Sequence, residues 1–108
     1  MPMTTKQVLI AARALIDAPE KWTKGESARR ANGLPTTVHS PDACQFCIEG
    51  AIRTASGEPT RPLAYIGAIA AFSEAADRPC QPAFAYNDAE ATTHADILGA
   101  LDKAIAAC

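Results

Sequence analysis

Alanine dominates the apolar part of this 108-residue sequence and restricts the kind of core it can build. Of the 52 apolar residues 24 are alanine, whereas Leu, Ile, Val and Phe together number 19. Residues that favour strands are scarce, with two Val, three Phe, two Tyr and one Trp. The net charge of −2 is too small for a disordered chain. These features predict an all-α fold around a thin core of closely packed alanine faces.

Start and stop signals predict a compact bundle of about five helices, one of them short, in a single domain over residues 1–108. The first helix follows Thr4, which forms a capping box with Gln7, and Pro19 prevents its continuation. Its apolar residues recur at helical spacing: Val8, Leu9, Ala12, Leu15 and Ile16.

Capping residues also predict the second and third helices. A short helix is expected from Thr23, which has Glu26 three residues later, to the pair Asn32-Gly33. The third is expected to follow Ser40 and to end at Gly57. Its buried stripe would comprise Cys44, Cys47, Ile48, Ala51, Ile52 and Ala55, and Glu49 and Arg53 would pair on its solvent-exposed side.

The fourth helix, from about residue 60–62 to about residue 77, is apolar on most sides, and we expect it to be central. One face holds Leu63, Ile66 and Ala70, and a second holds Tyr65, Ile69, Phe72 and Ala76. The third is an alanine stripe of Ala64, Ala68, Ala71 and Ala75 that would admit a close neighbouring helix. The fifth helix is expected to start at Thr92 or Thr93, with Asp96 completing a capping box. Its stripe would run through Ile97, Leu101, Ala104, Ile105 and Cys108.

The sequence contains no predicted membrane span or signal peptide. Its longest apolar run, Leu63 to Phe72, is half of what a bilayer span needs. The polar residues 1–6 and the interruption at Arg13 do not resemble a signal peptide. We therefore expect a cytoplasmic protein whose thiols stay reduced.

The pair Cys44-Gln45-Phe46-Cys47 allows three interpretations. The leading one places both cysteines in the core as small apolar side chains. A zinc site would need further ligands from Cys80, Cys108, His39 and His94, and this spacing matches no standard module. A redox pair would place its first cysteine at a helix N-terminus, whereas Cys44 would lie a full turn inside the expected helix. The sequence accordingly predicts no metal and no cofactor.

Residues 78–91 form a long expected connection, and the candidate binding residues gather at residues 80–94. They are Phe84, Tyr86, Asn87, Asp88 and His94, with Trp22 expected nearby. Amide groups at the start of the last helix could receive an anion. In the alternative interpretation the two rings plug the core, which we expect more of Phe84 than of Tyr86, and Asn87-Asp88 forms a turn.

Neither catalysis nor nucleic-acid binding is indicated. The sequence lacks the nucleophile, phosphate-loop and metalloprotease motifs, so no catalytic residue is assigned. Residues 1–30 carry a charge of +3, but the basic side chains alternate with acidic ones. A DNA-reading third helix would present Asp42 and Glu49 to phosphates, which argues against that function.

The order of several motifs resembles a domain-of-unknown-function family of small helical bacterial and phage proteins. The motifs are Trp22 after a first helix, the segment closing at Gly33, Cys47-Ile48-Glu49-Gly50-Ala51, and Tyr86-Asn87-Asp88 with Thr92-Thr93 before a last helix. The resemblance spans roughly residues 8–106 and rests on order and spacing. It implies a compact helical protein and no particular activity. Cys44 lies outside the shared pattern, and Cys47 lies inside it.

The function expected from these observations is that of a small, non-enzymatic accessory protein with a protein partner, such as a phage-type modulator of a host protein. The alternative is a small-ligand or metal-binding protein, or a minor enzyme, that uses residues 80–94. The two are distinguished by what lies between the third helix and residues 80–94. A ligand site there would favour the alternative, whereas a filled core with an exposed apolar patch would favour a protein partner.

Overall fold

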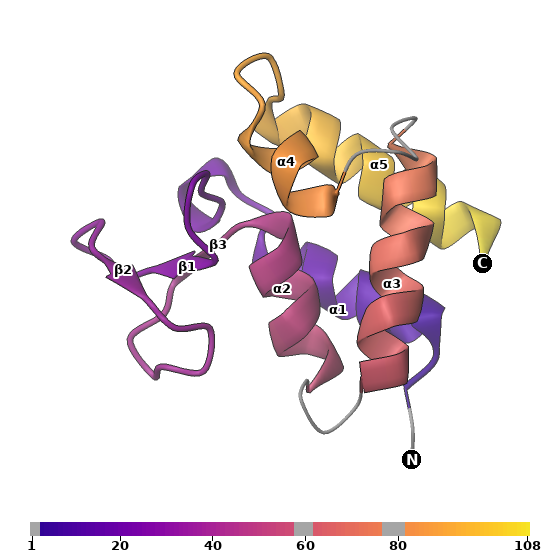
Figure 1. Cartoon of the computed structure of the whole chain (residues 1–108), viewed down its shortest axis with the longest axis horizontal. Helices are drawn as coiled ribbons and strands as arrows, with labels where there is room; N and C mark the ends of the chain where they lie inside the picture. Colours follow the sequence, from indigo (N-terminus) through magenta and orange to yellow (C-terminus); the bar gives the residue numbers. More distant parts are fainter. Residues whose placement is uncertain (1–2, 58–61, 77–81) are drawn as a thin grey trace.

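Five α-helices and a small sheet make up the described part of the chain, residues 3–57, 62–76 and 82–108, in a computed structural model (Figure 1). The first half contains α1 (Thr5–Leu15), the 3-10 turn η1 (Pro19–Lys21), β1 (Ala28–Arg29), β2 (Pro35–Thr36) and β3 (Gln45–Phe46). The second half contains α2 (Ile48–Ser56), α3 (Pro62–Ala75), α4 (Ala83–Asp88) and α5 (His94–Ala107). The prediction of about five helices, one of them short, is confirmed, but the fold is not purely all-α because an antiparallel sheet of order β2-β1-β3 projects from one end.

Helix α1 begins at the predicted position and supplies much of the core. The Thr4 hydroxyl accepts a hydrogen bond from the Gln7 amide at 3.1 Å, and the Gln7 side chain accepts one from the Thr4 amide at 2.9 Å. This confirms the predicted capping box. The α1 side chains of Val8, Leu9 and Ala12 are fully buried, because α1 packs against α2, α3 and α5.

The second predicted helix is wrong, because a β-hairpin stands in its place. β1 and β2 pair antiparallel, and the Arg30 amide donates to the Leu34 carbonyl at 2.9 Å around Asn32-Gly33. The Thr23 hydroxyl accepts from the Arg29 guanidinium at 2.8 Å instead of capping a helix. Asn-Gly is a hairpin signal as well as a helix-ending one, and this segment has little apolar surface with which to hold a helix.

The third predicted helix begins later than expected. The Ser40 hydroxyl accepts from the Asp42 amide at 3.2 Å, which makes a turn and not a helix start. The following residues extend into β3, which pairs with the free side of β1. Helix α2 therefore begins at Ile48 with Cys47 as its N-cap, and it ends as predicted at Gly57, whose φ is +75°.

Helix α3 matches its predicted range but is not the enclosed central helix. Ala68 and Phe72 on its inner side are fully buried against the neighbouring helices. On its outer side Leu63 is 82% exposed and Ile66 is 58% exposed, and Ala70 is exposed as well. The expectation of a central helix is therefore wrong for the face that holds Leu63, Ile66 and Ala70.

The predicted connection at residues 78–91 contains a helix in its described part. The six residues of α4 lie there, with Ala83 buried, while residues 78–81 are outside the described residues. Helix α5 starts with the predicted capping box: the Thr93 hydroxyl accepts from the Asp96 amide at 3.1 Å, and Asp96 accepts from the Thr93 amide at 3.0 Å. Cys108, predicted on the buried stripe, is exposed at the end of α5.

The buried apolar side chains form one cluster shared by the helices and the sheet. Its fully buried larger members are Val8, Leu9, Ile16, Ile48, Ile52, Phe72, Ile97 and Leu101. None of the helices in the described residues has the length and apolar character that crossing a membrane requires.

Candidate functional site

Asn87 is the centre of a buried polar network that joins three distant segments. Its side-chain oxygen accepts from the Trp22 indole at 2.7 Å and from the Ile48 amide at 3.0 Å. Its side-chain nitrogen donates to the Thr23 carbonyl and to the Asp88 carboxylate, both at 3.0 Å. The structure thus brings Trp22 and Asn87 together as predicted. Because Asn87 is fully buried and uses its hydrogen bonds within the chain, its role is structural.

Residues 24 and 25, which follow Trp22 and Thr23 in the chain, form hydrogen bonds with residues 88 and 89 at the end of α4. The Asp88 carboxylate accepts from the Gly25 amide at 2.9 Å, and Gly25 has a φ of +83° that favours glycine. The Lys24 ammonium donates to the Ala89 carbonyl at 2.7 Å and lies 5.6 Å from the centre of the Trp22 ring. Residues 22–25 and α4 therefore form one braced unit.

The two candidate aromatic residues of α4 have opposite environments. Phe84 is 52% exposed, whereas Tyr86 is half-buried with its ring 6.0 Å from that of the buried Phe72. The expectation that Phe84 would be the more buried of the two is wrong. Side chains two residues apart point to nearly opposite sides of a helix, and the side that packs against Phe72 of α3 is that of Tyr86.

His94 faces the interior of the chain. Its Nε2 atom lies 2.6 Å from the Ile16 carbonyl oxygen, and its ring centre lies 5.8 Å from that of Trp22. The N-terminal turn of α5, whose amide groups could receive an anion, holds the Asp96 carboxylate of the capping box. The structure gives no support to an anion site at this position.

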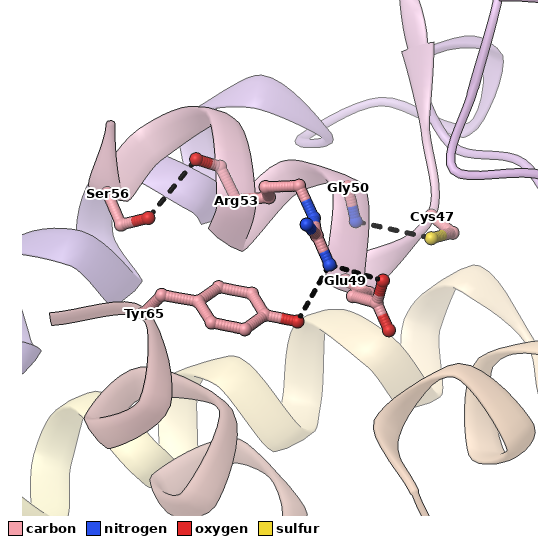
Figure 2. A network of polar contacts seen from close by, with 6 residues as sticks. All are labelled: Cys47, Glu49, Gly50, Arg53, Ser56 and Tyr65. Atoms are coloured by element: carbon pink, nitrogen blue, oxygen red, sulfur yellow. Dashed lines mark hydrogen bonds and ion pairs between the residues drawn. The ribbon is translucent and has the colours of Figure 1, made fainter. Parts of the chain in front are cut away.

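The cysteines of the Cys44–Cys47 pair do not share a buried helical stripe. Cys44 is exposed before β3, so its predicted burial is wrong. Cys47 is only 4% exposed, which confirms its burial, but its sulfur caps α2 by accepting from the Gly50 amide at 3.2 Å (Figure 2). Residues 45 and 46 pair in the sheet, and this separates the two cysteines from any common helix.

Burial raises the pKa of the Cys47 thiol above its ordinary value. The Gly50 and Glu49 amides lower the pKa of this thiol, but to a smaller extent, and the carboxylates of Glu49 and Asp88 raise it further. A reactive cysteine needs a lowered pKa and access to solvent. The environment of Cys47 is the reverse of this and does not suit a redox nucleophile.

No group of three or more His, Cys, Asp or Glu side chains that could hold a metal lies within residues 3–57, 62–76 and 82–108. Cys80, one of the ligands considered, is outside these ranges.

A groove of about 340 Å³ opens between the start of α2, the end of α4 and residues 25–27. Its lining contains three carboxylates, those of Glu26, Glu49 and Asp88, and neither a Lys nor an Arg. Phe84 forms part of its wall and Cys47 contributes to its lining. The groove therefore combines an exposed aromatic ring with an acidic lining.

A second groove of about 350 Å³ adjoins the first, and the two share Glu26, Ser27 and Glu49 in their linings. Arg53 lies in the second groove, where its guanidinium donates to Glu49 and to the Tyr65 hydroxyl, at 3.1 and 3.3 Å (Figure 2). The Arg53–Glu49 pair was predicted from its spacing of four residues, whereas its link to Tyr65 on α3 was not. This contact places the Glu49 carboxylate at the boundary between the two grooves.

Sequence reasoning missed most of the groove. Asp88 and Phe84 were among the candidates, but Glu26 was interpreted as part of a capping box and Glu49 as a solvent-exposed partner of Arg53. Their meeting depends on the hairpin and on the late start of α2. The Asn32-Gly33 pair is a local signal for the hairpin that was interpreted as a helix end, whereas no local pattern signals the late start of α2.

Comparison with known proteins places the chain in a family without an assigned function. No curated protein and no solved structure matches it. The model of one family matches residues 1–107, nearly the whole chain, which extends the resemblance noted from the sequence. The chain therefore belongs to the family of unknown function DUF6197.

Proposed function

We propose that this chain is a non-enzymatic accessory protein that binds a protein partner, and that the acidic groove beside Phe84 receives a basic segment of that partner. The observation that carries the proposal is the 52% exposed Phe84 ring at a groove lined by three carboxylates. Aromatic side chains anchor many protein interfaces.

Charge defines the chemistry of the partner segment. A cationic side chain would meet Glu26 and Asp88 across the groove, and its flat or aliphatic part would lie on the Phe84 ring. Arginine fits both demands because its planar guanidinium stacks on aromatic rings and pairs with carboxylates. The same lining repels phosphates, which argues against a nucleic-acid partner.

The groove walls are held in place before any partner arrives. Asn87 fixes α4 to the start of α2, and Asp88 and Lys24 fix α4 to residues 24–25. A partner therefore binds without ordering these segments first, which lowers the entropic cost of association.

Action as a phage-type modulator of a host protein in the cytoplasm belongs to the same proposal. It is supported by the small size of the chain and by the resemblance described above. Among the described residues, the alternative of a small-ligand or metal site at residues 80–94 has only the open groove beside Phe84 in its favour. Trp22, Asn87 and His94 use their polar atoms on other parts of this chain.

Site-specific photocrosslinking tests the proposal. A photoreactive phenylalanine analogue would replace Phe84, and in a control protein it would replace Leu34, which is similarly exposed at 57% on the hairpin. We expect a discrete covalent adduct with one protein from position 84 and none from position 34, in cells that naturally contain the chain. Adducts from both positions, or from neither, would refute the assigned surface.

A charge variant tests the basic character of the segment. Glu26→Lys reverses one exposed charge in the groove without touching the buried network. We expect crosslinking from position 84 to fall about tenfold, because rim charges govern the association rate. Unchanged crosslinking, with the same circular dichroism spectrum, would show that charge does not select the partner.

A further inference from the structure

Arg53 shows how the chain itself holds a guanidinium group. Its Nη2 atom donates to the Glu49 carboxylate at 3.1 Å and to the Tyr65 hydroxyl at 3.3 Å (Figure 2). The central guanidinium carbon lies 5.0 Å from the centre of the Tyr65 ring. A carboxylate of α2 and an aromatic ring of α3 thus act together on one guanidinium, which is the combination that this planar cation favours.

The groove beside Phe84 contains the same kinds of group without a cation. Glu49 lines this groove as well as the second one, whereas Arg53 lines only the second. Phe84 supplies the aromatic ring, and Glu26 and Asp88 supply further carboxylates. Among the described residues that line the groove, three carry a negative charge and none is a Lys or an Arg. The groove therefore complements a guanidinium from another molecule.

Two of the three carboxylates have an oxygen that forms no hydrogen bond with the described residues. Asp88 accepts from the Gly25 amide and from the Asn87 side chain, both through Oδ1. Glu49 accepts from Arg53 through Oε1. The other oxygen of each carboxylate can therefore accept from a donor in the groove, while these bonds hold the group in place. The Glu49 side chain is only 24% exposed, and this partial burial strengthens its attraction to a cation.

We propose that the groove selects an arginine of the partner segment over a lysine, with Glu49 as the selecting carboxylate and with Arg53 and Tyr65 as the residues that position it. This inference rests on the proposed function and narrows it from any basic segment to one that presents arginine. A guanidinium donates through several N–H groups at fixed angles, so it can bond two carboxylates while its face lies on Phe84. A lysine ammonium is compact and strongly hydrated, so it keeps the charge attraction but gains less from the ring.

The positioning of Glu49 follows from the way in which Arg53 is held. The Tyr65 hydroxyl and ring keep the Arg53 guanidinium in the second groove, where it bonds one oxygen of Glu49. This bond restrains the carboxylate at the boundary of the first groove. A restrained acceptor binds a donor at a lower entropic cost than a free side chain does. Removal of the Tyr65 hydroxyl should therefore weaken arginine binding, although Tyr65 does not line the first groove.

NMR titrations test this selection with two matched probes, N-acetyl-arginine N-methylamide and N-acetyl-lysine N-methylamide. The backbone amides of Gly25 and Gly50 report on binding, because they donate to Asp88 and Cys47 in the groove lining. We expect both amide signals to shift with the arginine probe at millimolar concentrations, as for any ligand of this small size. The lysine probe should bind about tenfold more weakly.

The Glu49→Gln variant identifies the selecting carboxylate. It should weaken arginine binding about tenfold and lysine binding much less, so the ratio of the two dissociation constants should approach one. Tyr65→Phe should lower the selectivity to a smaller extent, because the ring remains. Glu90→Gln removes one exposed negative charge outside the groove lining and should leave the selectivity unchanged. Phe84→Leu, at an exposed position, should also lower the selectivity and provides the test if Glu49→Gln alters the fold.

Three results would overturn the inference. Equal affinities for the two probes would show that the groove takes any cation, and the proposed function would then stand without selectivity. An unchanged selectivity in Glu49→Gln would assign the selection to another group. The absence of any shift at Gly25 and Gly50 would exclude arginine from the groove. Crosslinking from position 84 decides the proposed function separately, because it requires no arginine in the partner.

Discussion

Replacing Gly50 by alanine is expected to destabilise the fold, although the same change usually stabilises a helix. An ideal Cβ at Gly50 would lie 2.1 Å from the Ser27 carbonyl oxygen and 3.2 Å from a methyl carbon of Val38. Ser27 belongs to the segment that joins the braced residues 22–25 to β1. Its carbonyl also accepts the Cys47 amide at 3.2 Å, so it cannot simply turn away.

The magnitude follows from how far the two backbones must separate. An ordinary contact between the added Cβ and a carbonyl oxygen is about 3.5 Å, so the start of α2 would have to move by roughly 1.4 Å from the Ser27 carbonyl oxygen. Overpacking of this kind costs about 1–3 kcal/mol, and the weakened Cys47–Ser27 hydrogen bond adds about 1 kcal/mol. Alanine loses less conformational freedom on folding than glycine does, and this stabilises the folded state by about 0.5–1 kcal/mol. The net expectation for Gly50→Ala is a loss of about 1–3 kcal/mol.

Urea unfolding of the Gly50→Ala variant measures this loss, with Gly99→Ala as the matched control. Gly99 lies in α5 with no atom within 4 Å of its ideal Cβ, so its replacement should raise the unfolding free energy by about 0.5–1 kcal/mol. The two variants should therefore move the unfolding midpoint in opposite directions. If Gly50→Ala raises the midpoint as Gly99→Ala does, the close approach of α2 to Ser27 is refuted.

Four further tests probe the buried network, the buried thiol and the alanine stripe. Asn87→Ala removes the acceptor of two buried donors and should cost about 2–4 kcal/mol in urea unfolding; a loss below about 0.5 kcal/mol would contradict the network. Alkylation by iodoacetamide at pH 8 should be fast at Cys44 and slow at Cys47, and equal rates would contradict the burial of Cys47. Since the folded protein raises the pKa of Cys47, the unfolded chain releases this proton first. Below the unfolded-state pKa of about 8.5, Cys47 should not affect how the free energy of unfolding depends on pH. Above that pKa the free energy of unfolding should fall as the pH rises. The Cys47→Ala variant should show a smaller fall. Ala68→Leu should lower the free energy of unfolding by about 1–3 kcal/mol, because Ala68 is fully buried. Ala70→Leu, on the exposed face of α3, should change the melting temperature little. Equal effects of the two changes would show that the alanine stripe containing Ala68 does not pack against a neighbouring helix.

Local chemistry at the helix ends was readable from the sequence. Thr4 and Thr93 begin α1 and α5 with the capping boxes that their spacing predicts. Gly57 ends α2 at a positive φ. In each case the cap lies beside a strong apolar stripe, so the local signal and the core agree. Such signals involve residues three or four apart and need no knowledge of the rest of the chain.

Tertiary contacts decided the segment from Thr23 to Cys47, where the sequence alone was misleading. Thr23 and Ser40 have the same hydroxyl that caps a helix, but the same group also accepts from a guanidinium or closes a turn. Pairing of β3 with β1 delayed the start of α2 and made Cys47 its cap. Strand pairing joins residues far apart in sequence, so no local pattern could announce it.

The candidate site shows the same division between local sequence and tertiary structure. The sequence by itself marked Trp22, Asn87 and Asp88 as residues that belong together, and the structure joins them in one buried network. Only the tertiary structure decided that Phe84 stays in water and that Glu26 and Glu49 meet beside it. The physical reason is that a helix or strand pattern gives the spacing of side chains along one element. Which side of that element is covered depends on the free energy of packing against every other element at once.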